Sequence, residues 1–168
     1  MKNIFLVLMF ALLATACGNN TDSSSEGTTD QMEEKAPQSE MDASGEAKVE
    51  LTGNDQMQYD KKEIKVKAGQ KVTLTLTHIG KMSKDVMGHN FVLLKPGTDM
   101  AAFAQQAMAA KDNDYIPEDS SSIIVHTKVL GGGESDTITF DAPAPGTYDY
   151  ICSFPGHYAL MQGKFIVE

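Results

Sequence analysis

Apolar and polar residues alternate with a period of two over much of the chain from residue 48 onward. The run Lys71-Val72-Thr73-Leu74-Thr75-Leu76-Thr77 places its apolar side chains on one face, as a half-buried β-strand requires. Residues 63–67 repeat the pattern, and residues 68–70 between them have the composition of a turn. Similar runs follow at residues 91–94, 123–130, 136–140, 147–152 and 164–167. Many short strands separated by turn signals predict an all-β fold, built as a β-sandwich.

One segment interrupts the β pattern. Residues 99–110 are rich in alanine, glutamine and methionine, and they contain no β-branched residue. Because such residues favour helices over strands, we expect one helix inserted between the strands.

The N-terminus has the features of an export signal. Lys2 supplies a positive charge, and residues 4–13 form an apolar run too short for a transmembrane helix. We therefore expect residues 1–16 to be a signal peptide that the mature protein lacks. Ala14-Thr15-Ala16 fits ordinary signal cleavage, but Cys17 follows directly and resembles the lipidated cysteine of bacterial lipoproteins. Leu13 lies one position further from Cys17 than that lipoprotein pattern prefers.

Composition changes again after Cys17. Between residues 18 and 47 the sequence has eight acidic residues, one lysine and few apolar residues, within a chain of formal net charge −9. Such a segment cannot bury enough apolar surface to fold, so we interpret residues 17–47 as a lipidated cysteine followed by a disordered acidic linker. The remaining chain is nearly neutral and has no clustered basic face, which argues against nucleic-acid binding.

The candidate chemistry lies near the C-terminus, where Cys152, His157 and Met161 follow one another with the spacing Cys-x4-His-x3-Met. Thiolate and thioether ligands suit Cu(I), and imidazole accepts both copper oxidation states. Each of these residues taken alone has another explanation, since a single cysteine or methionine is more often a packed core residue than a metal ligand. A blue-copper site also needs a second imidazole, and Gly88-His89-Asn90 upstream supplies one.

With these motifs together, residues 48–168 resemble the azurins, the bacterial members of the cupredoxin family. The likeness extends to residues 53–57, 68–78, 125–128 and 163–168. It implies a Greek-key β-sandwich with a helical flap at residues 99–110, and one type 1 copper ion. The implied ligands are His89, Cys152 and His157, with Met161 and the Gly88 carbonyl as weak axial contacts. The backbone N–H groups of Asn90 and Phe154 are implied donors to the Cys152 sulfur.

The resemblance also implies a one-electron carrier rather than an enzyme. Apolar residues near His157 would form a docking patch through which electrons enter and leave; the alternative is that they belong to the core. The patch residues are Met57, Met87, Pro155, Ala159 and Leu160. Expected partners are redox proteins such as c-type cytochromes and copper or haem reductases. The domain is expected to be monomeric and held by its lipid on the periplasmic side of the outer membrane.

Two other functions fit part of the pattern. A lipoprotein that buffers or delivers copper would favour open sites rich in methionine and histidine, but residues 17–47 contain two methionines and no histidine. An oxidase or reductase domain would need a substrate-open metal or further copper ligands, and the two remaining histidines, His78 and His126, are far apart in the sequence.

Overall fold

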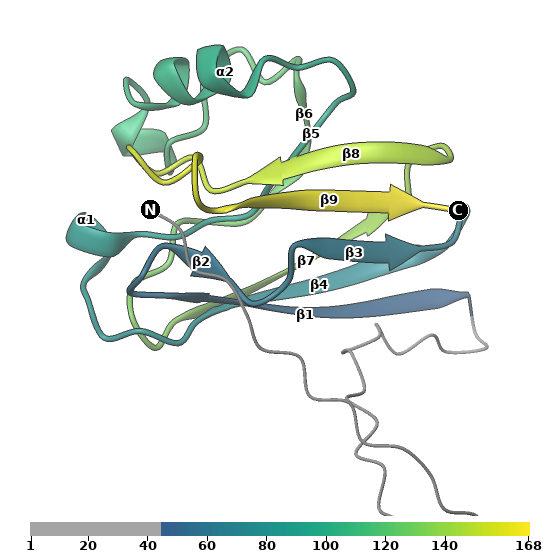
Figure 1. Cartoon of the computed structure of the whole chain (residues 1–168), viewed down its shortest axis with the longest axis horizontal. Coiled ribbons are helices and arrows are strands. Elements are labelled where there is room, and N and C mark those ends of the chain that lie inside the picture. The colour runs from purple at the N-terminus through teal and green to yellow at the C-terminus, as the bar shows by residue number, and fades with distance from the viewer. Residues whose placement is uncertain (1–44) are drawn as a thin grey trace, which may run out of the picture. The chain divides into compact units, whose positions relative to one another are not determined.

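The computed structural model describes residues 45–168, which form β-strands and three short helices (Figure 1). The predicted signal peptide, Cys17 and most of the predicted linker lie outside the described residues. In chain order the elements are β1 (Glu46–Asn54), β2 (Gln58–Tyr59), β3 (Glu63–Val66), β4 (Lys71–His78), α1 (Lys84–Met87), β5 (Val92–Leu94), α2 (Met100–Ala107), the 3-10 helix η1 (Lys111–Asn113), β6 (Ile123–His126), β7 (Ser135–Asp141), β8 (Gly146–Ile151) and β9 (Gln162–Val167).

The strands form two sheets packed face to face, which confirms the predicted all-β sandwich. One sheet has the order β2-β1-β4-β7 and the other β3-β9-β8-β5-β6. In β1, β3, β4 and β9 alternating residues enter the shared core, among them Val49 and Leu51 of β1, Leu74 of β4 and Phe165 of β9. The strand alternation in the sequence therefore exists because each strand has one face in the core.

The outer face of the first sheet carries hydroxyl side chains. Thr73, Thr75 and Thr77 of β4 lie opposite Thr139, Thr137 and Ser135 of β7, and each pair forms a hydrogen bond. These cross-strand pairs contribute a few tenths of a kcal/mol to about 1 kcal/mol each. They also keep the polar face of the sheet in register.

Both ends of the described chain meet at the turn between β3 and β4. The Ala68 N–H donates to the Glu168 carbonyl (2.8 Å), and the Lys71 N–H donates to the Gly45 carbonyl (3.1 Å). Gly69 in this turn has a φ of 79°, a backbone conformation that glycine adopts without a steric cost. From here β1 runs along the sandwich, so Gly53 at its other end lies roughly 23 Å away.

The predicted helix is α2. Its N-terminus is capped by Asp99, whose side chain accepts from the N–H groups of Ala101 and Ala102, and its inner face buries Phe103. The structure adds α1 and η1, which the sequence patterns did not predict. Within residues 45–168, no helix has the length and apolar character needed to cross a bilayer.

One predicted strand is shorter than expected. The apolar run 123–130 forms a strand over Ile123–His126, after which the regular pairing stops. The Thr127 hydroxyl accepts from the Phe91 N–H (2.9 Å) and donates to the Lys128 carbonyl (3.0 Å). This side chain replaces a backbone partner of the Phe91 N–H, while the Thr127 N–H still donates to the Phe91 carbonyl (3.0 Å). Beyond this point the two segments pair in a bridge between His89 and Leu130.

Candidate metal centre

The loop between β8 and β9 holds three of the predicted ligands. The Cys152 N–H donates to the Met161 carbonyl (2.9 Å), which closes the base of the loop. Inside it, the Met161 N–H donates to the His157 carbonyl (2.8 Å) and the His157 N–H to the Phe154 carbonyl (3.0 Å). Gly156 supplies the left-handed turn residue, with φ 82°. The loop is therefore held closed by its own backbone.

The fourth predicted ligand, His89, lies just before β5. Its backbone exchanges two hydrogen bonds with Leu130, at 3.0 and 2.7 Å. Its ring places Nε2 2.8 Å from the Asn54 carbonyl oxygen and Nδ1 2.9 Å from the Gly88 carbonyl oxygen. A neutral imidazole has one N–H, so it can donate to only one of these two carbonyls. If the proton is on Nε2, the lone pair of Nδ1 faces a lone pair of the Gly88 oxygen, and the two repel each other. A cation near these atoms would remove this repulsion.

Donor atoms from both segments converge at one end of the sandwich. The nearest ligand atoms of His89, Cys152 and His157 all lie within 4.8 Å of one another, and all three residues are buried. The Cys152 sulfur is 3.7 Å from His157 Nδ1 and 3.8 Å from the Gly88 oxygen. Met161 is also fully buried. A set of two imidazoles and one thiol, with a thioether in the same loop, fits a copper ion.

Burial sets the protonation of these groups in the metal-free protein. It raises the pKa of the Cys152 thiol to about 12, although the backbone N–H groups of Asn90 and Phe154 act in the opposite direction. Burial also lowers the pKa of His157 to about 4, with further contributions from His89 and His78. The pKa of His89 is lowered too, again chiefly by burial. The imidazoles are thus neutral at pH 7 and available as ligands.

Asn90 connects the His89 segment to the ligand loop. Its side-chain oxygen accepts from the Ser153 N–H (2.8 Å), and its side-chain nitrogen donates to the Ser153 hydroxyl (2.8 Å). The same nitrogen also donates to the Asp114 carbonyl (3.1 Å). Asp114 and Tyr115 have φ values of 51° and 56°, unusual for residues other than glycine. The segment after α2 therefore helps to hold the Asn90 side chain, which connects His89 to the ligand loop.

The model of the plastocyanin/azurin family of copper-binding proteins matches residues 45–168. The chain belongs to this family. Azurin-1 of Alcaligenes xylosoxydans xylosoxydans is 51% identical over 123 residues, which cover 70% of this chain and 95% of that protein. Azurin of Bordetella pertussis is 49% identical over 123 residues, covering 70% of this chain and 81% of the relative.

Solved structures of the family agree with this assignment. Auracyanin A, a "blue" copper protein from the green thermophilic photosynthetic bacterium Chloroflexus aurantiacus, superposes with a TM-score of 0.65 at 40% identity. The alignment covers 72% of this chain and 98% of auracyanin A. Dithionite-reduced auracyanin of Roseiflexus castenholzii gives the same TM-score at 41% identity, over 72% of this chain and 96% of its own.

Family membership determines the cofactor and the class of function. The protein binds type 1 copper and acts as a copper-based electron carrier. It is an electron-transfer protein rather than an enzyme, so the oxidase or reductase alternative does not apply.

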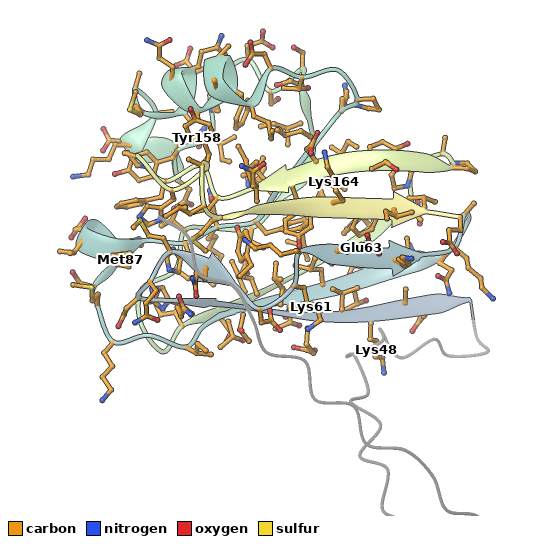
Figure 2. The ribbon with its side chains drawn as sticks, in the orientation of Figure 1. Lys48, Lys61, Glu63, Met87, Tyr158 and Lys164 are labelled. Carbon is orange, nitrogen blue, oxygen red and sulfur yellow. The ribbon has the colours of Figure 1, made fainter. Side chains whose placement is uncertain are left out.

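The predicted docking residues lie partly or largely at the surface. Met57, Met87 and Pro155 are partly buried, whereas Ala159 and Leu160 are exposed. Figure 2 shows Met87 at the end of α1 and Tyr158 in the loop after β8. The sequence patterns missed further exposed apolar residues, namely Ile79, Met82, Val86 and Met108. They lie outside the regular strands, where alternation gives no indication of exposure.

Three further features surround the donors. Gly53 has no room for a side chain, because an added Cβ would lie 2.9 Å from His89 Cδ2 and 3.3 Å from Met161 Cε. The Tyr59 hydroxyl donates to the backbone carbonyl of Asn90. His78 stacks on His89, with ring centroids 4.2 Å apart. The sequence patterns did not indicate the roles of Gly53 and Tyr59, because the proximity of these residues to the donors arises only from the fold.

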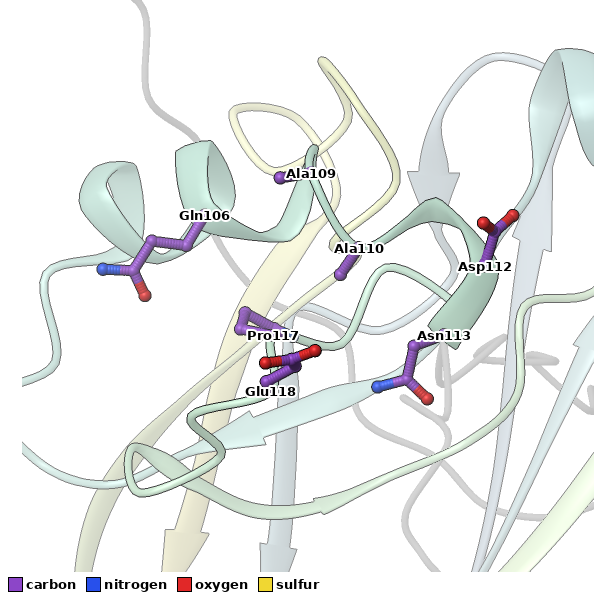
Figure 3. A pocket seen from close by; sticks show the side chains of 7 residues that line it. All are labelled: Gln106, Ala109, Ala110, Asp112, Asn113, Pro117 and Glu118. Carbon is purple, nitrogen blue, oxygen red and sulfur yellow. The ribbon is translucent and has the colours of Figure 1, made fainter.

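A surface hollow of about 440 Å³ lies between the end of α2 and η1 (Figure 3). Its lining includes Gln106, Asp112, Asn113 and Glu118, and none of the donor residues. The Asn113 side chain is already used in a hydrogen bond to the Ile116 carbonyl (2.8 Å). The hollow is therefore separate from the metal centre.

Proposed function

We propose that His89, Cys152 and His157 would hold the copper ion, with Met161 and the Gly88 carbonyl as weaker ligands. The observation that carries this assignment is the convergence of the three buried donor groups within 4.8 Å. Asn90 and Phe154 support the Cys152 sulfur through their backbone N–H groups. When bound, copper supplies the chemistry of the protein by alternating between Cu(II) and Cu(I).

The chain keeps the donors in nearly fixed positions. The ligand loop is closed by the hydrogen bond from the Cys152 N–H to the Met161 carbonyl, and His89 is fixed by its contact with the Asn54 carbonyl. The Cys152 thiol gives up its proton when the metal binds, because the thiolate is the ligand. A rigid donor set changes little between the two oxidation states, which favours fast electron transfer.

Electrons enter and leave at the edge of the His157 ring. The surrounding patch comprises Met57, Met87, Pro155, Ala159 and Leu160, and the side chain of Leu160 is 53% exposed. Exposed apolar patches of this kind are typical docking surfaces. The partners are redox proteins, such as c-type cytochromes and copper or haem reductases, and the domain acts as a monomer.

The protein works in the cell envelope. Residues 1–16 direct export, residues 17–47 comprise the lipidated Cys17 and an acidic linker, and residues 48–168 form the electron-transfer domain. The lipid holds the protein on the periplasmic side of the outer membrane. The family match begins at residue 45, which supports a functional division near this position.

The ligand assignment is tested by Cys152→Ser. This nearly isosteric change keeps the fold but removes the thiolate, so the intense thiolate-to-Cu(II) absorption should disappear. The measurement is the visible spectrum of the protein after addition of Cu(II). A blue colour that survives the substitution would show that Cys152 is not the ligand.

Met161→Leu is the matched variant, because it removes the other sulfur of the same loop while keeping the side-chain volume. We expect the variant to retain copper and its blue colour. The reduction potential should rise, since a weaker axial donor disfavours Cu(II). Complete loss of copper would show that Met161 is needed to hold the metal.

A further inference from the structure

Tyr59 lies in the short strand β2, beside the metal centre. Its ring is 4% exposed and packs against Tyr150 with ring centroids 5.6 Å apart. Its hydroxyl donates to the backbone carbonyl of Asn90, the residue after the ligand His89. Building on the ligand set proposed above, we propose that Tyr59 is a positioning residue for the copper centre, which holds the Asn90 backbone so that its N–H points at the Cys152 sulfur.

Asn90 is restrained at almost every polar atom, and Tyr59 supplies the restraint on its carbonyl. The side-chain amide is bound to Ser153 and Asp114, and the Asn90 N–H is directed at the Cys152 sulfur. The peptide that carries the Asn90 carbonyl is also fixed at its other end, where the Phe91 N–H donates to Thr127 Oγ1 (2.9 Å). The hydroxyl of Tyr59 therefore completes the restraint of this peptide.

The hydroxyl of Tyr59 is suited to this role because it remains protonated. Burial, and to a smaller extent the nearby Cys152 group, raise the pKa of Tyr59 well above its usual value. A buried carbonyl needs a hydrogen-bond donor, and at this position Tyr59 is the one that supplies it. Replacing the phenol by a phenyl ring would leave the Asn90 carbonyl buried without this bond.

The β1–β2 hairpin, residues 53–59, holds two successive residues of the ligand segment. The Asn54 carbonyl lies 2.8 Å from His89 Nε2, and the Tyr59 hydroxyl binds the Asn90 carbonyl. The hairpin is itself fixed, because the Asn54 side chain accepts from the N–H groups of Gln56 (3.0 Å) and Gln58 (3.2 Å). A single rigid element thus positions both the imidazole and the N–H donor to the sulfur.

The expected effect is electronic as well as structural. An N–H group that donates to a thiolate withdraws negative charge from the sulfur, which makes the thiolate a weaker donor to Cu(II). Loosening of the Asn90 backbone weakens this hydrogen bond. The reduction potential should then fall, because the more electron-rich thiolate stabilises the oxidised metal.

The test is Tyr59→Phe, with Tyr150→Phe as the matched control. Tyr150 is a buried tyrosine in ring contact with Tyr59, but its hydroxyl donates to the Lys61 carbonyl (2.7 Å) rather than to Asn90. Tyr59→Phe should lower the reduction potential and shift the thiolate-to-copper absorption. Tyr150→Phe should leave both at the wild-type values while it lowers thermal stability.

A second measurement does not need copper. In the metal-free protein, amide hydrogen exchange of Asn90 and Phe91 should become roughly fivefold faster in Tyr59→Phe, since one hydrogen bond no longer holds this backbone. Tyr150→Phe should not change the exchange at these two positions. Equal exchange rates in the two variants would overturn the proposal.

If Tyr59→Phe does not accumulate, 3-fluorotyrosine provides the same test with the opposite sign. Its more acidic hydroxyl donates more strongly, so the reduction potential should rise in the wild type and in Tyr150→Phe alike. An unchanged potential in these proteins, or in Tyr59→Phe, rejects the role of Tyr59. The ligand assignment is tested separately by Cys152→Ser, so the failure of one proposal is distinguishable from the failure of the other.

Discussion

His157 shows how one buried side chain links metal binding to stability. Burial, followed by the neighbouring His89 and His78, lowers the pKa of His157 to about 4 in the metal-free protein. The unfolded chain binds a proton at this group near its ordinary pKa of about 6.5, whereas the folded chain does not. Below that pH, protonation therefore favours the unfolded state.

The metal-free protein should lose stability as the pH falls from about 6.5 towards 4. The stabilisation is fully present above pH 6.5, and the pKa shift of His157 corresponds to a loss of about 3 kcal/mol at the acid end. Chemical denaturation of the metal-free protein over this pH range measures the loss.

His157→Gln provides the control for this prediction, because it removes the titrating group and should flatten much of the slope. The copper-loaded wild type should depend on pH at least as steeply in this range, since the ligated imidazole stays unprotonated in the folded protein while the unfolded chain, having released the metal, takes up protons. An equal acid slope in wild type and His157→Gln would assign the effect to other groups.

At the scale of elements, the β1–β2 hairpin packs directly against the donor residue His89. Gly53→Ala adds a Cβ that would lie 2.9 Å from His89 Cδ2, closer than packed atoms allow. The His89 ring must move, so we expect weaker copper binding and a changed visible spectrum. A copper titration followed by absorption measures both effects.

Thr52→Ala is the matched control, because Thr52 precedes Gly53 in β1 and its side chain points to the opposite face. It should leave copper binding unchanged. A spectrum of Gly53→Ala that is identical to that of Thr52→Ala would show that the site adapts to the extra carbon.

The sequence predicted those elements whose pattern is local. Strands such as β4 alternate because one face lies in the core, and the helix at Met100–Ala107 is preceded by a capping aspartate. The two-residue strand β2 and the short helix α1 are too short for a periodic pattern. Asp114 and Tyr115 have left-handed backbone conformations, but neither residue is a glycine, so the sequence did not indicate these conformations.

The same distinction applies to the metal centre. Cys152, His157 and Met161 were predicted because they lie in one loop with a recognisable spacing, and His89 because its neighbours match a family motif. Gly53 and Tyr59 lie more than 80 residues before the loop in the sequence. Their roles depend on how the hairpin packs against the donors, which periodicity and spacing do not encode.

At the scale of the whole molecule, the proposed lipid anchor at Cys17 and the electron-transfer domain lie in different parts of the chain. Multiple acyl chains on an N-terminal cysteine bind membranes stably, whereas one chain binds only marginally. The wild type should therefore fractionate with membranes. Cys17→Ala should instead yield a soluble form, or an unprocessed one, with the copper spectrum unchanged. Membrane fractionation combined with mass spectrometry of the mature N-terminus measures this.

Cys152→Ser is the reciprocal control, since it should lose the blue colour but remain with the membranes. A mature wild-type protein that is soluble and carries an unmodified Cys17 thiol would contradict the anchoring proposal. The copper chemistry of the domain would be unaffected by that result.

Both ends of the domain lie at the β3–β4 turn, so the domain can be joined to other proteins or surfaces from that side. Gly45 and Glu168 bind the two sides of one short turn, and the donors lie at the opposite end of β1. A fusion partner, an electrode linker or a second redox module attached at either end would therefore leave the His157 edge uncovered. The two ends are also close enough for a short bridge to join them, which makes the domain a natural candidate for circular permutation.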